Sequence, residues 1–135
     1  KLKGFIGIAS APEFLEKLMW KKFNKKIKEI IMTKGIYHLK HDKFIYPLSK
    51  QLILDGRRNK VFNKKIKLNI PFVLFHGTKD KVVPLNFSKN LIKICKSNKK
   101  KLIKIKNGDH SLSRKRDLEK ICNELYAISK NKNSI

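Results

Sequence analysis

The segment PFVLFHG at residues 71–77 has apolar side chains at odd and even positions alike. A strand with one face in water alternates apolar and polar residues, so this run indicates a strand that is buried on both faces. Strands of that kind belong to parallel sheets that are covered by helices. We therefore expect an α/β fold that contains this strand.

The segments on either side fit the same architecture. Residues 2–9 form a short apolar run that predicts a buried strand, and residues 101–106 alternate isoleucine with lysine, as a strand near a sheet edge does. Amphipathic patterns predict helices at 86–97 and after Ser113. The apolar stripe expected to face the core in this last helix consists of Leu118, Ile121, Cys122, Leu125 and Ile128. Alternating strands and helices imply a parallel sheet with right-handed crossovers, in one domain or part of one.

A different pattern interrupts this order at residues 13–60. Apolar residues recur at helical spacing over 13–31, and Gly35 indicates the end of that helix. An irregular stretch is expected at 37–46, followed by a second helix at 47–54. We therefore expect a helical insertion between the first strand and the second.

The charge of the chain is strongly positive, with 34 lysines and arginines against 10 aspartates and glutamates, a formal net charge of +24. Such a surface attracts nucleic acid and anionic membranes without specificity. Arginine, which makes bidentate contacts with phosphates and bases, occurs only at Arg57, Arg58, Arg114 and Arg116. The lysines are spread along the chain and are not interleaved with aromatic residues as in a single-strand binder. We interpret the charge as a solvated lysine-rich surface and expect no specific nucleic-acid partner.

The remaining composition concerns compartment and cofactors. Cys95 and Cys122 lie at core-like positions of expected helices, so we expect two buried thiols in a reducing compartment, with a disulfide bridge between them as the alternative. His38 and His41 lie three residues apart, but no cluster of cysteines or carboxylates completes a metal set with them, so we expect no metal and no cofactor. No apolar run is long enough to span a membrane, and the start KLKGFIGIASAP lacks the long apolar stretch of a secretory signal. We expect a cytoplasmic protein, with an organellar matrix as the alternative, and we place Lys1 inside a longer polypeptide.

Titratable side chains gather in two loops that follow expected strands. Asp80 comes after the strand at 71–77, and His110 comes after the last expected strand. Working residues of an open α/β sheet lie beyond the carboxyl ends of its strands, so adjacent strands would bring Asp80 and His110 together. An aspartate that accepts from an imidazole fixes its tautomer and stabilises its charged form during acyl transfer. We interpret Asp109 as a turn residue, with an exchange of roles with Asp80 as the alternative, and His76 as a histidine that packs against the loop.

HGTKDKVVP followed by GDH resembles the HGxxDxxVP and later His signature of the α/β-hydrolase superfamily. GFIGIASAPEFLEKLMW, MTKG and GDHSLSRKRDLEKI resemble a narrower group, the bacterial and mitochondrial α/β-hydrolases of the palmitoyl-protein thioesterase and acyl-glucuronide esterase type. The resemblance covers nearly the whole chain and implies that residues 1–135 are the C-terminal part of an α/β-hydrolase domain. Residues 1–12 would be a strand and loop, 13–60 a helical lid insertion, and 61–135 the C-terminal strands and helices with the acid and histidine loops.

By the same resemblance, Asp80 is the triad acid and His110 the general base of a serine hydrolase. The nucleophile motif GxSxG does not occur in the chain, and the resemblance places it upstream, with the loop that supplies an oxyanion-hole N–H. These residues alone are therefore expected to be inert. Phe14, Met19 and Trp20 would bind an acyl chain beneath the lid or, equally well, pack the apolar face of the insertion.

The sequence thus predicts a serine hydrolase that acts on small-molecule carboxylic esters or thioesters. Two other classes stay open. One is a hydrolase fold without the reaction, which binds a partner protein, and the presence or absence of an upstream GxSxG distinguishes it from the enzyme. The other is a basic nucleic-acid-binding module, which would bind DNA or RNA tightly and with a steep salt dependence.

Overall fold

The computed structural model describes residues 2–41 and 43–130. These residues form two compact units, one made of 2–12 and 62–130 and the other of Glu13–Val61. Among the residues described, no helix has the length and apolar character needed to cross a lipid bilayer.

The first unit contains a three-stranded parallel sheet in the order β1-β5-β7. Its strands are β1 (Phe5–Ile8), β5 (Phe72–Gly77) and β7 (Lys100–Ile105). In the middle of the sheet, β5 pairs with β1 on one side and with β7 on the other, and all its residues are buried. The prediction of a parallel strand buried on both faces is confirmed, and the lysine-rich strand does lie at an edge.

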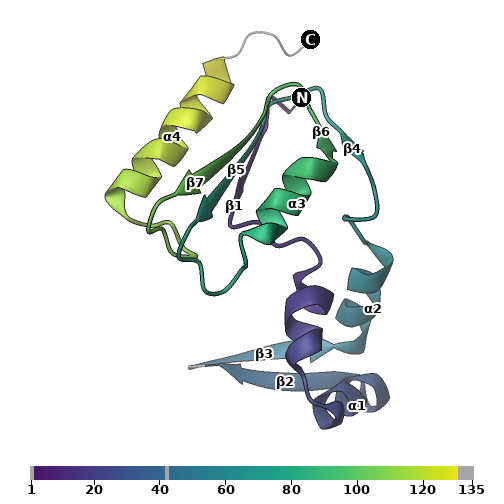
Figure 1. The fold of residues 1–135 in the computed structure, drawn as a ribbon. Helices are drawn as coiled ribbons and strands as arrows, with labels where there is room; N and C mark the ends of the chain where they lie inside the picture. The colour runs from purple at the N-terminus through teal and green to yellow at the C-terminus, as the bar shows by residue number, and fades with distance from the viewer. Residues whose placement is uncertain (1, 42, 131–135) are drawn as a thin grey trace. The chain divides into compact units, whose positions relative to one another are not determined.

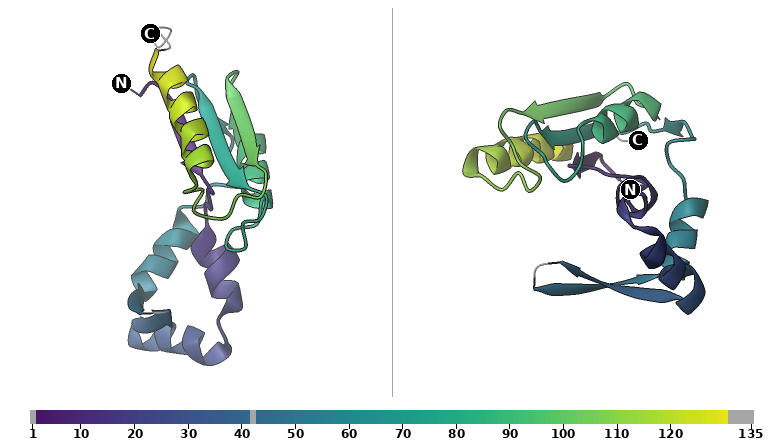
Figure 2. Two further views of the ribbon diagram at one scale, coloured as in Figure 1. Left: turned by 90° about the vertical axis from the view of Figure 1, so that its left-hand side faces the viewer. Right: turned by 60° about the horizontal axis from the view of Figure 1, so that its bottom comes forward.

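Two helices cover this sheet on opposite faces, as Figures 1 and 2 show. Helix α3 (Asn86–Ile94) follows β5, and α4 (Lys115–Lys130) follows β7. The core between α4 and the sheet consists of Val73, Phe75, Ile105, Leu112 and Ile128. Each fully buried side chain of this size contributes roughly 1.5–3 kcal/mol to folding, so this cluster holds β5, β7 and α4 together beneath the loops that end the two strands.

The expected inward stripe of α4 is only partly correct. Ile128 is buried and Ile121 packs against the core, but Leu118 is 48% and Leu125 57% exposed, and Cys122 is exposed as well. Helical spacing of apolar residues indicates that a face exists, whereas the neighbouring elements decide how much of it is covered. The prediction of two buried thiols is therefore wrong for Cys122.

The helix expected at 86–97 ends earlier. Cys95 has extended backbone angles, φ −76° and ψ 120°, and begins the short strand β6 (Cys95–Lys96). This strand pairs in parallel with β4 (Ile66–Lys67). Cys95 is fully buried in this position, as expected for its thiol.

The second unit joins three helical segments to a β-hairpin. Its elements are the π-helical segment η1 (Leu15–Trp20), α1 (Lys25–Lys34), β2 (Ile36–His41), β3 (Phe44–Ser49) and α2 (Lys50–Arg58). The buried centre of this unit consists of Ile31, Leu48 and Ile53. Each of these elements contributes side chains to this centre or to the residues that pack against it, so the insertion has a core of its own.

The single helix expected over 13–31 is two segments. The Asn24 side chain accepts a hydrogen bond of 2.9 Å from the backbone N–H of Ile27 and thereby starts α1 anew. Asparagine is among the preferred residues at this position, because its oxygen satisfies an amide that the helix leaves without a partner. Apolar spacing continues through Asn24 and conceals the break.

The stretch expected to be irregular at 37–46 is an antiparallel hairpin in which Tyr37 and Leu39 turn toward the core of the unit. The helix expected at 47–54 begins later, because Ser49 caps Leu52 and Pro47 lies in β3. It also continues to Arg58, four residues beyond the expected end and through Gly56. In the sequence, the only sign of this hairpin is that core-facing side chains recur at every second residue over a few positions, as at Tyr37 and Leu39.

Candidate active site

Asp80 lies in the turn that follows β5. Its Oδ1 atom accepts hydrogen bonds of 2.8 Å from the backbone N–H groups of both Val82 and Val83. Its Oδ2 atom lies 2.9 Å from Nδ1 of His110, and the Asp80 side chain is only 1% exposed. The carboxylate is therefore fixed at both oxygens, with one oxygen reserved for the imidazole.

The same contacts set the charge of the carboxylate. Burial alone raises the pKa of Asp80, but the hydrogen bonds from the backbone of Val83, from His110 and from the backbone of Val82 lower it, and the net pKa lies below the ordinary value of 3.8. A carboxylate that accepts several hydrogen bonds is stabilised in its ionised form. Asp80 is thus an anion at neutral pH and accepts from His110.

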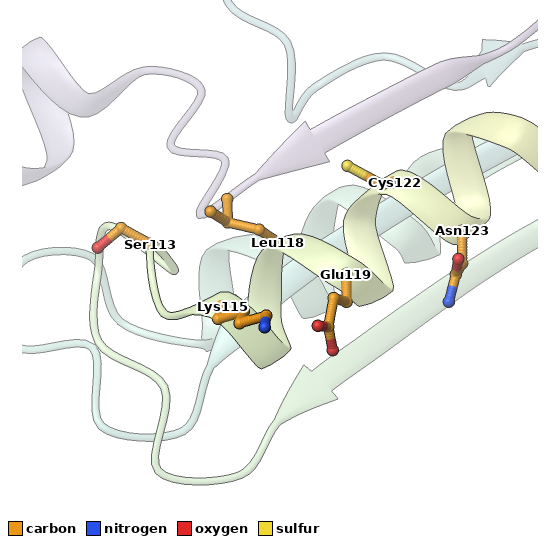
Figure 3. A pocket seen from close by; sticks show the side chains of 6 residues that line it. All are labelled: Ser113, Lys115, Leu118, Glu119, Cys122 and Asn123. Atoms are coloured by element: carbon orange, nitrogen blue, oxygen red, sulfur yellow. The ribbon is translucent and has the colours of Figure 1, made fainter.

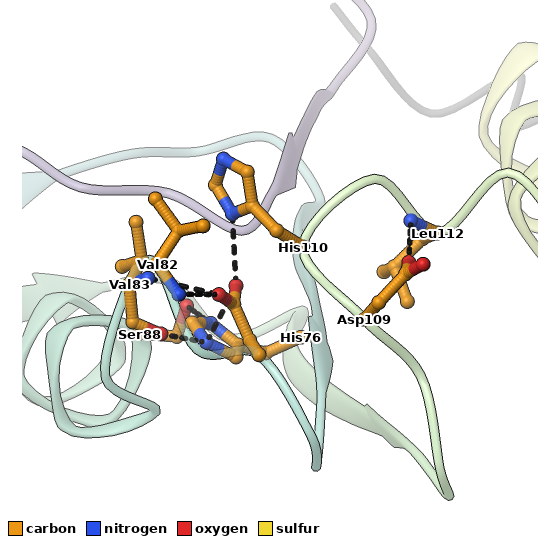
Figure 4. A network of polar contacts seen from close by, with 8 residues as sticks. His76, Val82, Val83, Ser88, Asp109, His110 and Leu112 are labelled. Atoms are coloured by element: carbon orange, nitrogen blue, oxygen red, sulfur yellow. Dashed lines mark hydrogen bonds and ion pairs between the residues drawn. The ribbon is translucent and has the colours of Figure 1, made fainter. Parts of the chain in front are cut away.

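His110 lies in the loop after β7, and its side chain is 42% exposed. Figure 4 shows one ring nitrogen directed at the carboxylate and the other directed away from it. Because Asp80 is an acceptor only, Nδ1 carries the hydrogen of this bond, and Nε2 of a neutral ring is left with its lone pair. An imidazole in that state can take a proton from a hydroxyl group that approaches Nε2.

Two glycines bring the acid and histidine loops together. A Cβ atom on Gly77, the last residue of β5, would collide with the backbone oxygens of Gly108 and Asp109. Across this contact the amide of Lys79 donates to the carbonyl of Gly108 at 2.8 Å, and the amide of Asn107 donates to Oγ1 of Thr78 at 2.8 Å. The two loops are therefore joined by their backbones, and His110 is held beside Asp80 by more than the bond between them.

Asp109 has a separate part in the histidine loop. Its Oδ1 atom accepts a hydrogen bond of 2.9 Å from the backbone N–H of Leu112, as in a turn. Figure 4 shows this contact apart from the one made by His110. The interpretation of Asp109 as a turn residue is confirmed, and the aspartate beside His110 is Asp80.

An ion pair between a partly exposed arginine and a buried aspartate, which sequence reasoning missed, anchors the histidine loop to α4. Arg114 donates from Nε and Nη2 to the two oxygens of Asp117, at 2.6 and 3.0 Å, and from Nη1 to the carbonyl of Asn107 at 2.7 Å. The Asp117 side chain is 1% exposed. In a sequence, an arginine three residues before an aspartate usually indicates an ordinary surface pair. Here only the burial of Asp117, which the sequence does not reveal, distinguishes this pair from such a surface pair.

The residues predicted to bind an acyl chain lie in the second unit. Met19 and Trp20 are half-buried and pack against the centre of that unit. The Trp20 ring also lies beneath the Arg57 guanidinium, 4.7 Å from its carbon to the ring centroid. Phe14 is 46% exposed. The packing alternative accounts for Met19 and Trp20, whereas the ring of Phe14 stays accessible to a ligand.

A shallow hollow of about 610 Å³ lies elsewhere in the first unit, along α4 (Figure 3). Leu118, Cys122 and the polar side chains of Glu119 and Asn123 line it. None of its lining residues belongs to the Asp80–His110 pair. Within the part of the chain that the structure describes, no group of three or more His, Cys, Asp or Glu side chains is arranged to hold a metal ion.

The chain matches one known family of proteins over most of its length. The sequence profile described as "Serine hydrolase (FSH1)" matches residues 10–121. The chain belongs to the FSH1 family of serine hydrolases. The match begins just after β1, runs through the loops that carry Asp80 and His110 and ends within α4, so it spans the second unit and much of the first unit of this FSH1-family chain.

The chain is also similar to a curated relative, and it shares its fold with solved structures. The human protein named "Palmitoyl-protein thioesterase ABHD10, mitochondrial" is 26% identical over 125 residues, which cover 88% of this chain and 40% of that protein. A candidate hydrolase from Agrobacterium vitis S4 superposes with a TM-score of 0.86 at 24% identity, over 95% of this chain and 50% of that one. Mouse "Alpha/beta hydrolase domain-containing protein 10" does so with a TM-score of 0.74 at 24% identity, over 94% and 52%. The expected α/β-hydrolase fold is confirmed, and the chain spans about half of these solved proteins.

Proposed function

We propose that this FSH1-family chain supplies the acid and the general base of a hydrolase that cleaves carboxylic esters or thioesters. The observation that carries the proposal is the 2.9 Å contact between Nδ1 of His110 and Oδ2 of Asp80. In the proposed reaction a serine hydroxyl gives its proton to Nε2 of His110 as its oxygen attacks the acyl carbon. Asp80 stabilises the imidazolium, and His110 returns the proton to the leaving alcohol or thiol before water releases the acid.

The serine is proposed to lie in a part of the fold that these residues do not span. This agrees with the length of the relatives, since the chain covers 40% of human ABHD10. The substrate class is supported by the name of that relative, a palmitoyl-protein thioesterase. The word "mitochondrial" in its name supports an organellar matrix, which is our alternative to a cytoplasmic location.

The unit Glu13–Val61 is proposed to act as a lid over the acyl group. Its buried centre supports this role, because a lid has to keep its fold by its own packing. Phe14 is the residue of this unit that we propose for contact with the acyl chain, because its ring is exposed while Met19 and Trp20 are packed.

The test compares three substitutions in the full-length protein, with hydrolysis of p-nitrophenyl butyrate and of a short acyl thioester as readouts. His110→Gln removes the general base and Asp80→Asn replaces the acceptor by an amide. Each should lower kcat by about 10⁴-fold while the protein stays folded. A fluorophosphonate that labels a single serine, located by mass spectrometry, would identify the nucleophile.

Asp109→Asn is the matched control, because an asparagine oxygen can still accept from the N–H of Leu112. It makes the same chemical change one residue from His110 and should leave kcat within about twofold. Hydrolysis that survives in His110→Gln would refute the proposal. A wild-type protein that neither hydrolyses acyl substrates nor takes the label would favour the fold without the reaction.

A further inference from the structure

His76 is a buried histidine that takes no part in the proposed proton transfers. It lies near the end of β5, is fully buried, and bonds through both ring nitrogens. Nδ1 lies 2.8 Å from Oγ of Ser88 on α3, and Nε2 lies 2.9 Å from the carbonyl oxygen of Val83. Figure 4 shows the ring between α3 and the turn that holds the acid.

The partners of His76 decide which nitrogen carries a hydrogen. A backbone carbonyl only accepts, so the contact with Val83 requires a hydrogen on Nε2 in either charge state of the ring. The Ser88 hydroxyl can donate or accept, so it adapts to whatever Nδ1 presents. Nε2–H of His76 is therefore a fixed donor that points into the acid turn.

That donor serves the residue that holds Asp80. The N–H of Val83 donates to Oδ1 of Asp80 while the carbonyl of Val83 accepts from His76. Nε2 also lies 3.4 Å from Oδ2 of Asp80, the oxygen that accepts from His110. One ring nitrogen thus holds the carbonyl of Val83, the residue whose N–H holds Oδ1 of Asp80, and also lies beside Oδ2 of the same carboxylate.

We propose that His76 is a positioning residue for the Asp80–His110 pair. Its Nε2–H holds the acid turn so that Oδ2 of Asp80 faces Nδ1 of His110, and Ser88 orients the ring from α3. The kinetic consequence rests on the proposed hydrolase function, whereas the effect on the Asp80–His110 hydrogen bond does not.

Two substitutions separate the roles of the ring nitrogens. In His76→Gln the side-chain amide nitrogen reaches the place of Nε2, so the donor to Val83 is kept. In His76→Asn the shorter amide reaches only the place of Nδ1, so the partner of Ser88 is kept and the donor to Val83 is lost. We expect His76→Gln to retain kcat within about threefold and His76→Asn to lose roughly tenfold to a hundredfold, with KM unchanged in both. Equal effects of the two variants, or a change confined to KM, would overturn the proposal.

A second readout does not depend on activity. In the full-length protein labelled with ¹⁵N-histidine, the proton between His110 and Asp80 should resonate far downfield of the amide protons and disappear in His110→Gln. We expect this signal to persist in His76→Gln and to be lost in His76→Asn. A signal that persists in folded His76→Asn would refute the positioning role. If the wild type is inactive but the signal behaves as expected, the hydrolase proposal fails and the positioning role stands.

The wild-type ring itself provides a measurement that survives if His76→Asn does not fold. The ¹⁵N spectrum of His76 should show a hydrogen on Nε2 at neutral pH. A ring with a bare Nε2 and a hydrogen on Nδ1 alone would contradict the proposal, because nothing would then be donated to Val83.

Discussion

Asp80 is held by contacts that assign different tasks to its two oxygens. Oδ1 takes the backbone N–H groups of Val82 and Val83, and Oδ2 takes His110. Backbone donors have directions set by the turn, so they keep the carboxylate from rotating away from the imidazole. Burial raises the pKa of Asp80, but these backbone bonds, together with the bond from His110, lower it below the ordinary value, so the bonds that orient the carboxylate also favour its charged form.

We predict that Asp80 contributes to stability in a pH-dependent way. Its pKa in the folded chain lies below the ordinary value of 3.8, so the contribution is present above that value and is lost as the pH falls through the folded pKa. The side chain of Asp80→Asn does not titrate. The unfolding free energy of the wild type should therefore exceed that of Asp80→Asn at about pH 6 and approach it at about pH 3. Urea unfolding of the full-length proteins measures this, and a difference that stays constant over the range would contradict it.

The proximity of Asp80 and His110 was predictable because it follows from topology alone, two loops at the carboxyl ends of adjacent parallel strands. The residues that support the pair were not. Arg114 and Asp117 resemble an ordinary surface pair until Asp117 is known to be buried. His76 was expected to pack against the loop, and it does, but its partner on α3 depends on how that helix is rotated about its axis, which apolar spacing defines only coarsely.

At the scale of elements, the meeting of the two loops depends on the absence of side chains at Gly77 and Gly108. Gly77 lies against the backbone of the histidine loop, and a Cβ on Gly108 would come within 2.6 Å of the Leu112 side chain. Neither glycine needs a positive φ; both are required by close approach. The strand end and the loop can therefore share backbone hydrogen bonds.

Gly77→Ala is predicted to separate these loops. The added methyl group would collide with backbone atoms that cannot turn aside, and overpacking of this kind costs about 1–3 kcal/mol of unfolding free energy. Because His110 moves with its loop, kcat should fall as well. Gly56→Ala is the matched control. Gly56 lies within α2, and the added Cβ would meet the Leu15 side chain at an ordinary 3.4 Å. The alanine should stabilise the helix by about 0.5–1 kcal/mol relative to glycine. Urea titration and p-nitrophenyl butyrate turnover measure both effects, and a Gly77→Ala protein as stable and active as wild type would contradict the prediction.

The elements of the first unit were predicted better than those of the insertion for a physical reason. A run such as 71–77, apolar at every position, has one stable environment, a covered parallel strand. In the insertion, apolar residues continue across Asn24, where a cap divides the helix. In the hairpin, apolar and polar residues alternate over too few positions to be distinguished from the flanking helices. The hairpin is recognised only from the antiparallel pairing of β2 with β3.

For the molecule as a whole, the first unit exposes apolar side chains at one sheet edge and on one helix face among the residues described. There β1 pairs with β5 alone, and Phe5 and Ile8 are each 45% exposed. On α4, Leu118 and Leu125 are exposed too. The opposite edge of the sheet, β7, is rich in lysine, and charged side chains of this kind discourage pairing with another strand.

We predict that residues 1–135 expressed alone associate or melt with low cooperativity. A net charge of +24 opposes association by repulsion, so association should increase between low salt and about 0.5 M salt, where charges are screened within a few ångströms. Ile8→Lys places a charge on the exposed edge and should restore solubility. Size-exclusion chromatography and calorimetry test this, and a sharp two-state melt of a monomer would contradict it.

Because the two thiols are unequally buried, they should react with a thiol reagent at different rates. Cys122 is exposed and open to alkylation at once, whereas Cys95 is fully buried and burial raises its pKa, so its reactive thiolate is scarce. Cys95 is itself part of β6 and pairs there with Ile66 of β4. A thiol reagent therefore modifies the chain in two phases, and the rate of the second reports how often the first unit opens under native conditions, without denaturant and without an engineered label.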